Sequence, residues 1–243
     1  MRILPAFCAF LLTISPLMKA QPSNPDESFS PDKLILPAAL IGIGAWGVSN
    51  GWFDLNVNQP VRAWAEDLRG ECYIHADDYL QFLPAAAYIG LGFVAEGEHT
   101  HSERLAVLVT SSVLVAATVN IVKYTVCSMR PDGTTRNAFP SGHTATAMMG
   151  AELIRLEYGP WYGAGAYAIA LGVAALRIYN NRHWSNDVLG GAAVGILSAN
   201  AAHWLLPLER KLLGIGNVSL QPAVFPAGEE RNYGYGMALS LMF

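Results

Sequence analysis

The chain has 243 residues, of which 52% are apolar and only 14% are charged. This length fits one large domain, and the composition is more apolar than that of an ordinary soluble protein, so a bilayer is the expected solvent. The formal net charge is -4, without a clustered run of Lys or Arg, which argues against nucleic acid as a partner.

The first residues have the pattern of an export signal. One charge, Arg2, precedes an apolar run that continues to Ile14, and a polar, proline-rich stretch follows. We predict a secretory signal peptide in residues 1–20 and a linker in residues 21–33. An uncleaved apolar anchor is the alternative, because Met18 occupies a cleavage-site position where a small residue is usual.

Six apolar stretches follow the linker. They are Leu34 to Ser49, Tyr79 to Ala95, Leu105 to Val122, His143 to Leu156, Trp161 to Leu176 and Val188 to Leu206. Several are near the lower limit of about 17 residues for crossing a bilayer, and small residues such as Gly191 and Gly195 predict close helix packing. The sequence predicts an all-α, membrane-embedded bundle of about six helices in residues 34–207. A soluble protein with buried helices is the alternative, but tryptophans near the segment ends favour the membrane.

The polar stretch from Asn50 to Asp78, between the first two segments, is interpreted as a long loop. It ends in Asp77 and Asp78, which could contact a substrate head group or only hydrate the start of the next helix. The second interpretation is favoured. We therefore assign neither aspartate to the site.

The chain has three cysteines, Cys8, Cys72 and Cys127, without the paired spacing of zinc or redox motifs. No metal site is predicted. In an exported compartment Cys72 and Cys127 could pair and tie the long loop to the residues after the third segment. Two unrelated buried thiols are the favoured alternative.

Polar patches follow the third segment and begin the fourth. Lys123 ends the third segment and Arg130 follows it, at positions where cations often reach toward the membrane surface. Ser141 can cap the fourth helix, and Gly142 lets backbone N–H groups approach a ligand. His143 lies in the first turn of this helix. The positive end of the helix dipole would then face an anion beside these side chains.

A third patch joins the fifth and sixth segments. Arg177 closes the fifth segment, and His183 and Asp187 are four residues apart at the start of the sixth, a spacing that brings imidazole and carboxylate to one face. Ionisable groups are costly in a membrane, and an up-and-down path of helices puts all three patches on one side. The sequence therefore predicts a metal-free site for phosphoryl transfer, where catalysis is mostly positioning and charge stabilisation.

The tail, residues 208–243, differs from the apolar segments. It contains Pro222 and Pro226, a turn near Gly228, and an alternating stretch that ends at Phe243. This pattern predicts a short β-hairpin. One hairpin cannot close a barrel, so we interpret the tail as an appendage of the bundle.

The three patches together match a known signature. They read as K-x6-RP from Lys123, PSGH from Pro140, and R-x5-H-x3-D from Arg177. In these motifs the chain resembles the superfamily of type 2 phosphatidic acid phosphatases and vanadium haloperoxidases, over roughly residues 79–206. One departure is visible, because Leu176 stands where that family usually has a serine.

The resemblance implies a role for each motif residue. Five residues would bind the phosphoryl oxygens: Lys123, Arg130, Ser141, Gly142 and Arg177. His183 would be the nucleophile that forms a phosphohistidine, and Asp187 would orient it. His143 would protonate the leaving group. No metal or cofactor is implied.

The expected function is hydrolysis of a lipid phosphate monoester or pyrophosphate by a membrane phosphatase. Lipid A phosphate and undecaprenyl pyrophosphate are the preferred substrates, and phosphatidic acid and phosphatidylglycerol phosphate are alternatives. A vanadium haloperoxidase and a non-catalytic anion-binding protein are competing functions, the latter supported only by Leu176. No obligate protein partner is evident.

The expected location is the bacterial inner membrane, with the site facing the periplasm. Cations on loops away from the site barely outnumber the other cations on the site side, which weakly favours this orientation. A cleaved leader followed by six spans predicts the opposite orientation. A short first segment that does not span would reconcile the two.

Overall fold

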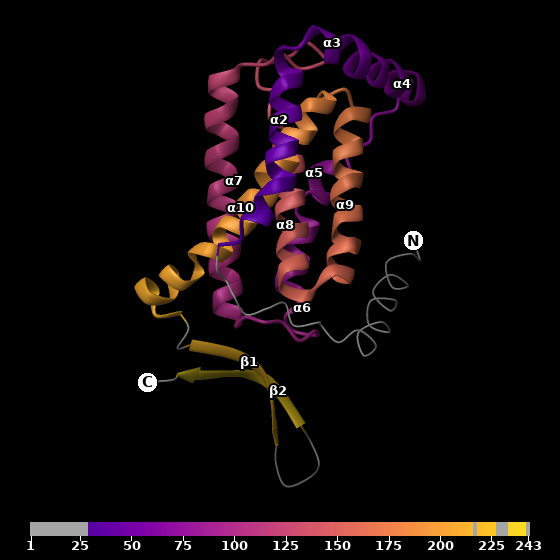
Figure 1. Ribbon diagram of the computed structural model, residues 1–243. Coiled ribbons are helices and arrows are strands. Elements are labelled where there is room, and N and C mark those ends of the chain that lie inside the picture. Colours follow the sequence, from indigo (N-terminus) through magenta and orange to yellow (C-terminus); the bar gives the residue numbers. More distant parts are fainter. Residues whose placement is uncertain (1–28, 216–217, 227–232, 242–243) are drawn as a thin grey trace.

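The computed structural model describes residues 29–215, 218–226 and 233–241 (Figure 1). The signal peptide or anchor predicted for residues 1–20 lies outside these ranges, as does most of the linker predicted for residues 21–33. The described helices continue to Leu213, a few residues beyond the predicted end of the bundle at residue 207.

The helices pack around α8, in the all-α bundle that the sequence predicts (Figure 1). In chain order the long helices are α2 (Ile35–Ser49), α4 (Gln59–Arg69), α6 (Leu83–Leu91), α7 (His101–Val126), α8 (Gly142–Tyr158), α9 (Pro160–Tyr179) and α10 (Ser185–Leu213). The short ones are η1 (Pro31–Leu34), α3 (Gly51–Phe53), η2 (Asp54–Asn58) and α5 (Asp77–Leu80). Helix α8 packs against α6, α7, α9 and α10, and α2 packs against α10.

Four helical stretches are long and apolar enough to cross a membrane: Pro31–Ser49, His101–Val126, Pro160–Tyr179 and Ser185–Leu213. Helix α7 exposes Leu105, Val109, Val113 and Ile121, which a bilayer would cover. This is the pattern of a membrane protein. The second apolar stretch differs from its prediction, because it forms the short helices α5 and α6 instead of one continuous span. Pro84 lies in the first turn of α6 and Gly92 at its end, and both limit its length.

The segment interpreted as a long loop is mostly helical, so that prediction is wrong. Helices α3, η2 and α4 follow one another from Gly51 to Arg69 and lie across one end of the bundle (Figure 1). Its apolar side chains Trp52, Leu55, Trp64 and Leu68 are exposed. Such a helix suits the membrane surface, and its many polar residues conceal it in the sequence.

Close packing between α8 and α10 depends on two glycines of α10. A methyl group at Gly191 would overlap the carbonyl oxygen of Ser141, and one at Gly195 would overlap that of Ala145. Both glycines therefore lie directly on the backbone of α8. The packing role predicted for this pair is confirmed, and it fixes the first turn of α10 beside the first turn of α8.

A buried polar cluster holds the other end of α8. Glu157, in its last turn, accepts hydrogen bonds from the backbone N–H of His99 at 2.9 Å and lies 3.7 Å from Arg104 Nε. Arg104 also donates to the Tyr158 hydroxyl at 2.7 Å, which in turn donates to the carbonyl of Tyr88. These bonds connect α8 to α6 and α7 at the end away from the predicted site.

The predicted hairpin is present after the bundle. Strand β1 (Val218–Pro226) pairs antiparallel with β2 (Tyr233–Leu241), with Val218 opposite Leu241 and Ala223 opposite Gly236. It lies beyond the end of α10, away from α3 and α4 (Figure 1). The hairpin therefore makes no part of the end where the motifs meet.

Gly195→Ala tests the packing of α10 on α8. The added methyl group would push the two backbones apart, and overpacking of this kind costs about 1 to 3 kcal/mol. We expect a lower midpoint of thermal unfolding in detergent. Gly172→Ala is the matched control, because this α9 position has open space around it, and alanine should stabilise that helix slightly. Equal midpoints for the two variants would contradict the packing assigned to Gly195.

Candidate active site

A cavity of about 270 Å³ opens where the motifs converge. It is lined by His75, Asp78, Arg130, Arg177, Asn180 and Arg182. Two of these, Arg130 and Arg177, are predicted phosphate ligands. Lys123, the third predicted cation, lies in the last turn of α7 and interacts electrostatically with both arginines. The structure therefore gathers the three cations at one place, as the sequence predicts.

Arg130 is held in the connection between α7 and α8. Its backbone N–H donates to the carbonyl of Thr135 at 3.0 Å, which closes a tight turn. Burial, and then repulsion from Arg177, lower the pKa of Arg130. An arginine remains charged after such a shift because its ordinary pKa is above about 12. Like charges held this close would be relieved by a bound phosphate dianion.

Ser141 is the N-cap of α8, as predicted. Its hydroxyl accepts hydrogen bonds from the backbone N–H of Thr144 at 3.5 Å and from the Thr144 hydroxyl at 2.9 Å. Its own N–H donates to the carbonyl of Asp187 at 2.9 Å. Ser141 is fully buried. The second and third motifs are thus joined through the backbone, with Gly142 in the first position of the helix.

The turn between α9 and α10 brings His183 back toward Arg177. The carbonyl of Arg177 accepts from the N–H groups of Arg182 at 3.0 Å and His183 at 3.3 Å. Asn181 has a φ of 56°, the left-handed conformation that asparagine tolerates better than most residues. This tight turn buries the His183 residue, which is only 2% exposed.

His183 and Asp187 lie together, as their spacing predicts. The distance from His183 Nδ1 to Asp187 Oδ2 is 3.5 Å, and both side chains are buried. The same carboxylate oxygen accepts from the N–H of Trp184 at 2.8 Å. Burial, and then the charges of Arg177, Arg130 and Lys123, lower the pKa of His183 well below its ordinary value. This shift favours the neutral imidazole, in which one ring nitrogen carries a lone pair, as a nucleophile requires.

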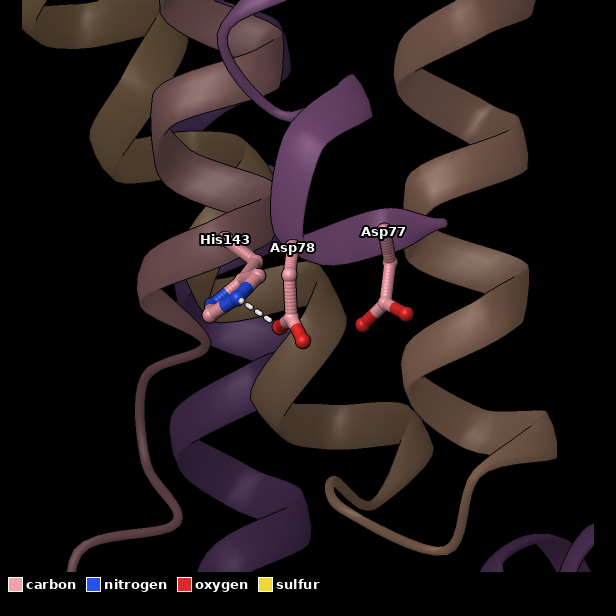
Figure 2. A group of neighbouring side chains, drawn as sticks. All are labelled: Asp77, Asp78 and His143. Atoms are coloured by element: carbon pink, nitrogen blue, oxygen red, sulfur yellow. Dashed lines mark hydrogen bonds and ion pairs between the residues drawn. The ribbon is translucent and has the colours of Figure 1, made fainter. Parts of the chain in front are cut away.

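Asp77 and Asp78 belong to the site, although the sequence interpretation left them out. Figure 2 shows both carboxylates beside His143. Asp77 Oδ2 accepts from Arg177 Nη1 at 2.6 Å, and Asp77 Oδ1 accepts from Asn180 at 3.1 Å. Asp77 is 1% exposed. The interpretation that it only hydrates a helix start is wrong, because it neutralises a buried arginine.

Asp78 lies between His143 and Arg177. Its Oδ1 lies 3.0 Å from His143 Nε2 and 3.7 Å from Arg177 Nη1 (Figure 2). The only local signal for either aspartate is a pair of acids directly before an apolar segment. Their partners lie on α8 and α9, far along the chain, so no spacing rule finds them.

The same three residues have the geometry of a cation site. Ligand atoms of Asp77, Asp78 and His143 lie within 4.8 Å of one another. Arg177 already donates to Asp77, and Arg130 lines the same cavity, so a divalent cation would have to displace one positive charge and approach another. The cluster fits Arg177 better than a metal ion.

A comparison of the chain with known protein families finds a match that includes most of these site residues. Residues 104–211 match the PAP2 superfamily. This match covers less than half of the 243 residues. The matched range contains every predicted site residue from Lys123 to Asp187, whereas Asp77 and Asp78 lie before it.

Several known proteins are similar to the chain. It is 39% identical to the lipid A 1-phosphatase of Porphyromonas gingivalis over 158 residues, which are 63% of this chain and 36% of that protein. The chain therefore spans little more than a third of that relative. The fold resembles the crystal structure of the first transmembrane PAP2 type phosphatidylglycerolphosphate phosphatase from Bacillus subtilis, with a TM-score of 0.53 and 19% identity, over 75% of this chain and 98% of that one. The crystal structure of Aquifex aeolicus LpxE is similar with a TM-score of 0.49 and 19% identity, over 60% of this chain and 93% of that one.

Cys72 and Cys127 are both free and exposed. The disulfide that the sequence left open is therefore not formed. The alternative, two unrelated buried thiols, is wrong because both thiols are exposed. Cys127 is the left-handed C-cap of α7, four residues after Lys123. The carbonyl of Cys72 accepts from the Tyr179 hydroxyl at 3.2 Å. Two thiols thus mark the site end of the bundle for chemical labelling.

Asp77→Asn tests the ion pair between Asp77 and Arg177. The amide keeps the shape of the side chain but leaves the Arg177 charge less compensated, and breaking a buried pair costs about 3 kcal/mol. We expect a lower unfolding midpoint in detergent. Inorganic phosphate should raise the midpoint more in this variant than in the wild type, because the anion replaces the missing charge. Asp67→Asn, at an exposed position of α4, should match the wild type in both measurements.

Proposed function

We propose that the chain is a membrane phosphatase that hydrolyses a lipid phosphate through a phosphohistidine, without a metal ion. The observation that carries this proposal is the buried His183 beside Asp187, on which the charges of Arg177, Arg130 and Lys123 act. Arg130 and Arg177 line the cavity. A phosphoryl group held by the cations would meet a nucleophile directly. Because this cavity lies at the ends of apolar helices, a lipid tail can stay in the bilayer while its head group enters.

The proposed reaction has two displacements. The His183 nitrogen attacks phosphorus, the bond to the lipid oxygen breaks, and His143 gives that oxygen a proton. Water then attacks the phosphohistidine, loses a proton to His143, and releases inorganic phosphate and free His183. Asp187 would orient the imidazole and support its positive charge in the intermediate. The 3.5 Å separation from Asp187 fits a resting state, since catalytic contacts often tighten only with substrate bound.

The phosphoryl oxygens would be held by both charges and dipoles. Five residues are proposed for this role: Lys123, Arg130, Ser141, Gly142 and Arg177. Ser141 would act mainly through the cap that it forms, because its hydroxyl is buried against Thr144. Leu176 is only partly buried, and each group required for the two displacements is present without the serine of the family signature. The proposed catalytic unit is residues 34–207, with the tail as an appendage.

The preferred substrate is a phosphate monoester of a lipid A type glycolipid. Its support is the 39% identity to a protein named lipid A 1-phosphatase, over a segment that is 63% of this chain. Undecaprenyl pyrophosphate is the second candidate, and it would require His143 to protonate a leaving phosphate instead of an alcohol. Phosphatidic acid and phosphatidylglycerol phosphate complete the assay panel.

His183→Ala and His143→Ala separate the two proposed roles. Purified wild-type protein in detergent should release phosphate from lipid A, and His183→Ala should be inactive with every substrate. His143→Ala should lose about 10²- to 10⁴-fold with lipid A, as expected for a lost general acid. With p-nitrophenyl phosphate, whose leaving group needs no proton, His143→Ala should lose far less. Undiminished hydrolysis by His183→Ala would refute the mechanism.

We further propose that the protein lies in the bacterial inner membrane with its site facing the periplasm. The support is the small excess of cations on loops away from the site, including Arg104, Arg155 and Arg210. The described η1 and α2 form a candidate span of 19 residues. A first segment too short to cross the membrane therefore does not explain a periplasmic site. The export signal and the cation excess thus favour opposite orientations, and labelling decides between them.

Cys72 and Cys127 provide the labelling sites for the orientation. In cells with a permeabilised outer membrane, a membrane-impermeant maleimide should label both thiols if the site faces the periplasm. The background is set by the double variant Cys72→Ser with Cys127→Ser, which retains Cys8. Labelling that appears only after the inner membrane is disrupted would place the site in the cytoplasm.

A further inference from the structure

The surface helix formed by α3, η2 and α4 reaches into the bundle beside the turn between α9 and α10, which carries His183. Asn58, the last residue of η2, is 4% exposed, although its neighbours Leu55 and Asn56 are exposed. η2 is a π-helical turn, a local widening that often occurs at functional sites. The turn allows one polar side chain of an otherwise surface-lying helix to point inward.

Asn58 starts a chain of buried hydrogen bonds that ends at the proposed nucleophile. Asn58 Nδ2 donates to Asn186 Oδ1 at 2.9 Å, and Asn186 Nδ2 donates to Asp187 Oδ1 at 3.1 Å. The other carboxylate oxygen of Asp187 faces His183 at 3.5 Å. Each of the four side chains is at most 4% exposed. Solvent therefore does not substitute for any of these bonds.

The donor and acceptor in each of these hydrogen bonds follow from the chemistry of the side chains. Asn186 turns its NH₂ group toward Asp187 Oδ1, and a carboxylate oxygen accepts such a hydrogen bond. Its oxygen then faces Asn58, which must also present an NH₂ group. Asn186 cannot easily move away, because a methyl group at Gly47 of α2 would overlap its side chain. The carboxylate is thus held from one side by a donor of fixed direction.

Further contacts dock the surface helix onto the same turn. The Arg62 guanidinium lies 5.7 Å from the centre of the Trp184 ring, and Arg69 donates to the carbonyl of Tyr179 at 2.8 Å. Trp184 also donates its indole N–H to the carbonyl of Met129, in the connection that carries Arg130. The surface helix therefore contacts both ends of the segment that carries His183.

We propose that Asn58 and Asn186 are positioning residues, which fix the Asp187 carboxylate so that its Oδ2 atom faces His183. This inference rests on the proposed function, because it assigns a purpose to the His183 and Asp187 pair. Neither asparagine lines the phosphate cavity. Their loss should therefore reduce kcat and leave KM nearly unchanged. A role in substrate binding would instead raise KM.

Asn58→Asp is the sharpest variant, since it keeps the shape and removes the donor. The new carboxylate would face the oxygen of Asn186, and we expect kcat to fall about 10- to 100-fold, the range typical of outer partners of site residues. Lowering the pH should restore activity relative to wild type, because the protonated carboxyl group can again donate. Asn56→Asp is the matched control, because Asn56 lies on the same helix, is exposed, and donates to the carbonyl of Trp52. The control should keep wild-type kcat and KM.

A second measurement does not depend on turnover. In protein labelled with ¹⁵N-histidine, the His183 signal is assigned by its loss in His183→Ala, and Asn58→Asp should change the tautomer ratio that its ring nitrogens report. Wild-type kcat and an unchanged tautomer in Asn58→Asp would overturn the inference. A loss of kcat without recovery at low pH would also overturn it, by indicating general damage to the fold. If the wild type itself hydrolyses no lipid phosphate, the proposed function fails, and the tautomer measurement still decides the role of Asn58.

Discussion

Repulsion among the cations gathered at the site is the constraint on which this molecule depends. Arg177 is almost completely buried, and Arg130 and Lys123 interact with it unfavourably at the ends of apolar helices. A membrane protein can hold such a group only if nearby carboxylates compensate it. Asp77 supplies the direct bond and Asp78 a longer one. The segment between α4 and α6 is therefore needed for the folded state as well as for the cavity.

Backbone proximity is the second requirement, and glycine provides it. Gly191 brings α10 against the start of α8, and the N–H of Ser141 then reaches the carbonyl of Asp187. Larger residues at these positions would separate the cap of α8 from the turn that carries His183. The small residues of the apolar segments thus serve the geometry of the site as well as the packing of the bundle.

Local features of the site could be predicted from the sequence, and long-range ones could not. The spacing of His183 and Asp187, the cap at Ser141 and the packing at Gly191 follow from rules that apply within one or two helical turns. The contacts of Asp77 and Asn58 could not be predicted, because their partners are 100 and 128 residues away in the chain. The helix from Gly51 to Arg69 could not be predicted either, because a polar composition does not reveal a helix that lies on a membrane surface.

Helix α8 is fastened by polar groups at both ends, through Ser141 at its start and Glu157 near its finish. A helix anchored in this way has a fixed axial register, since sliding by even one residue would break bonds at both ends in a medium without water to replace them. His143, in the first turn of α8, consequently has a fixed position along the helix axis. Adjustments that admit the proposed substrate must then come from the periphery of the site, where Asp78 is half exposed.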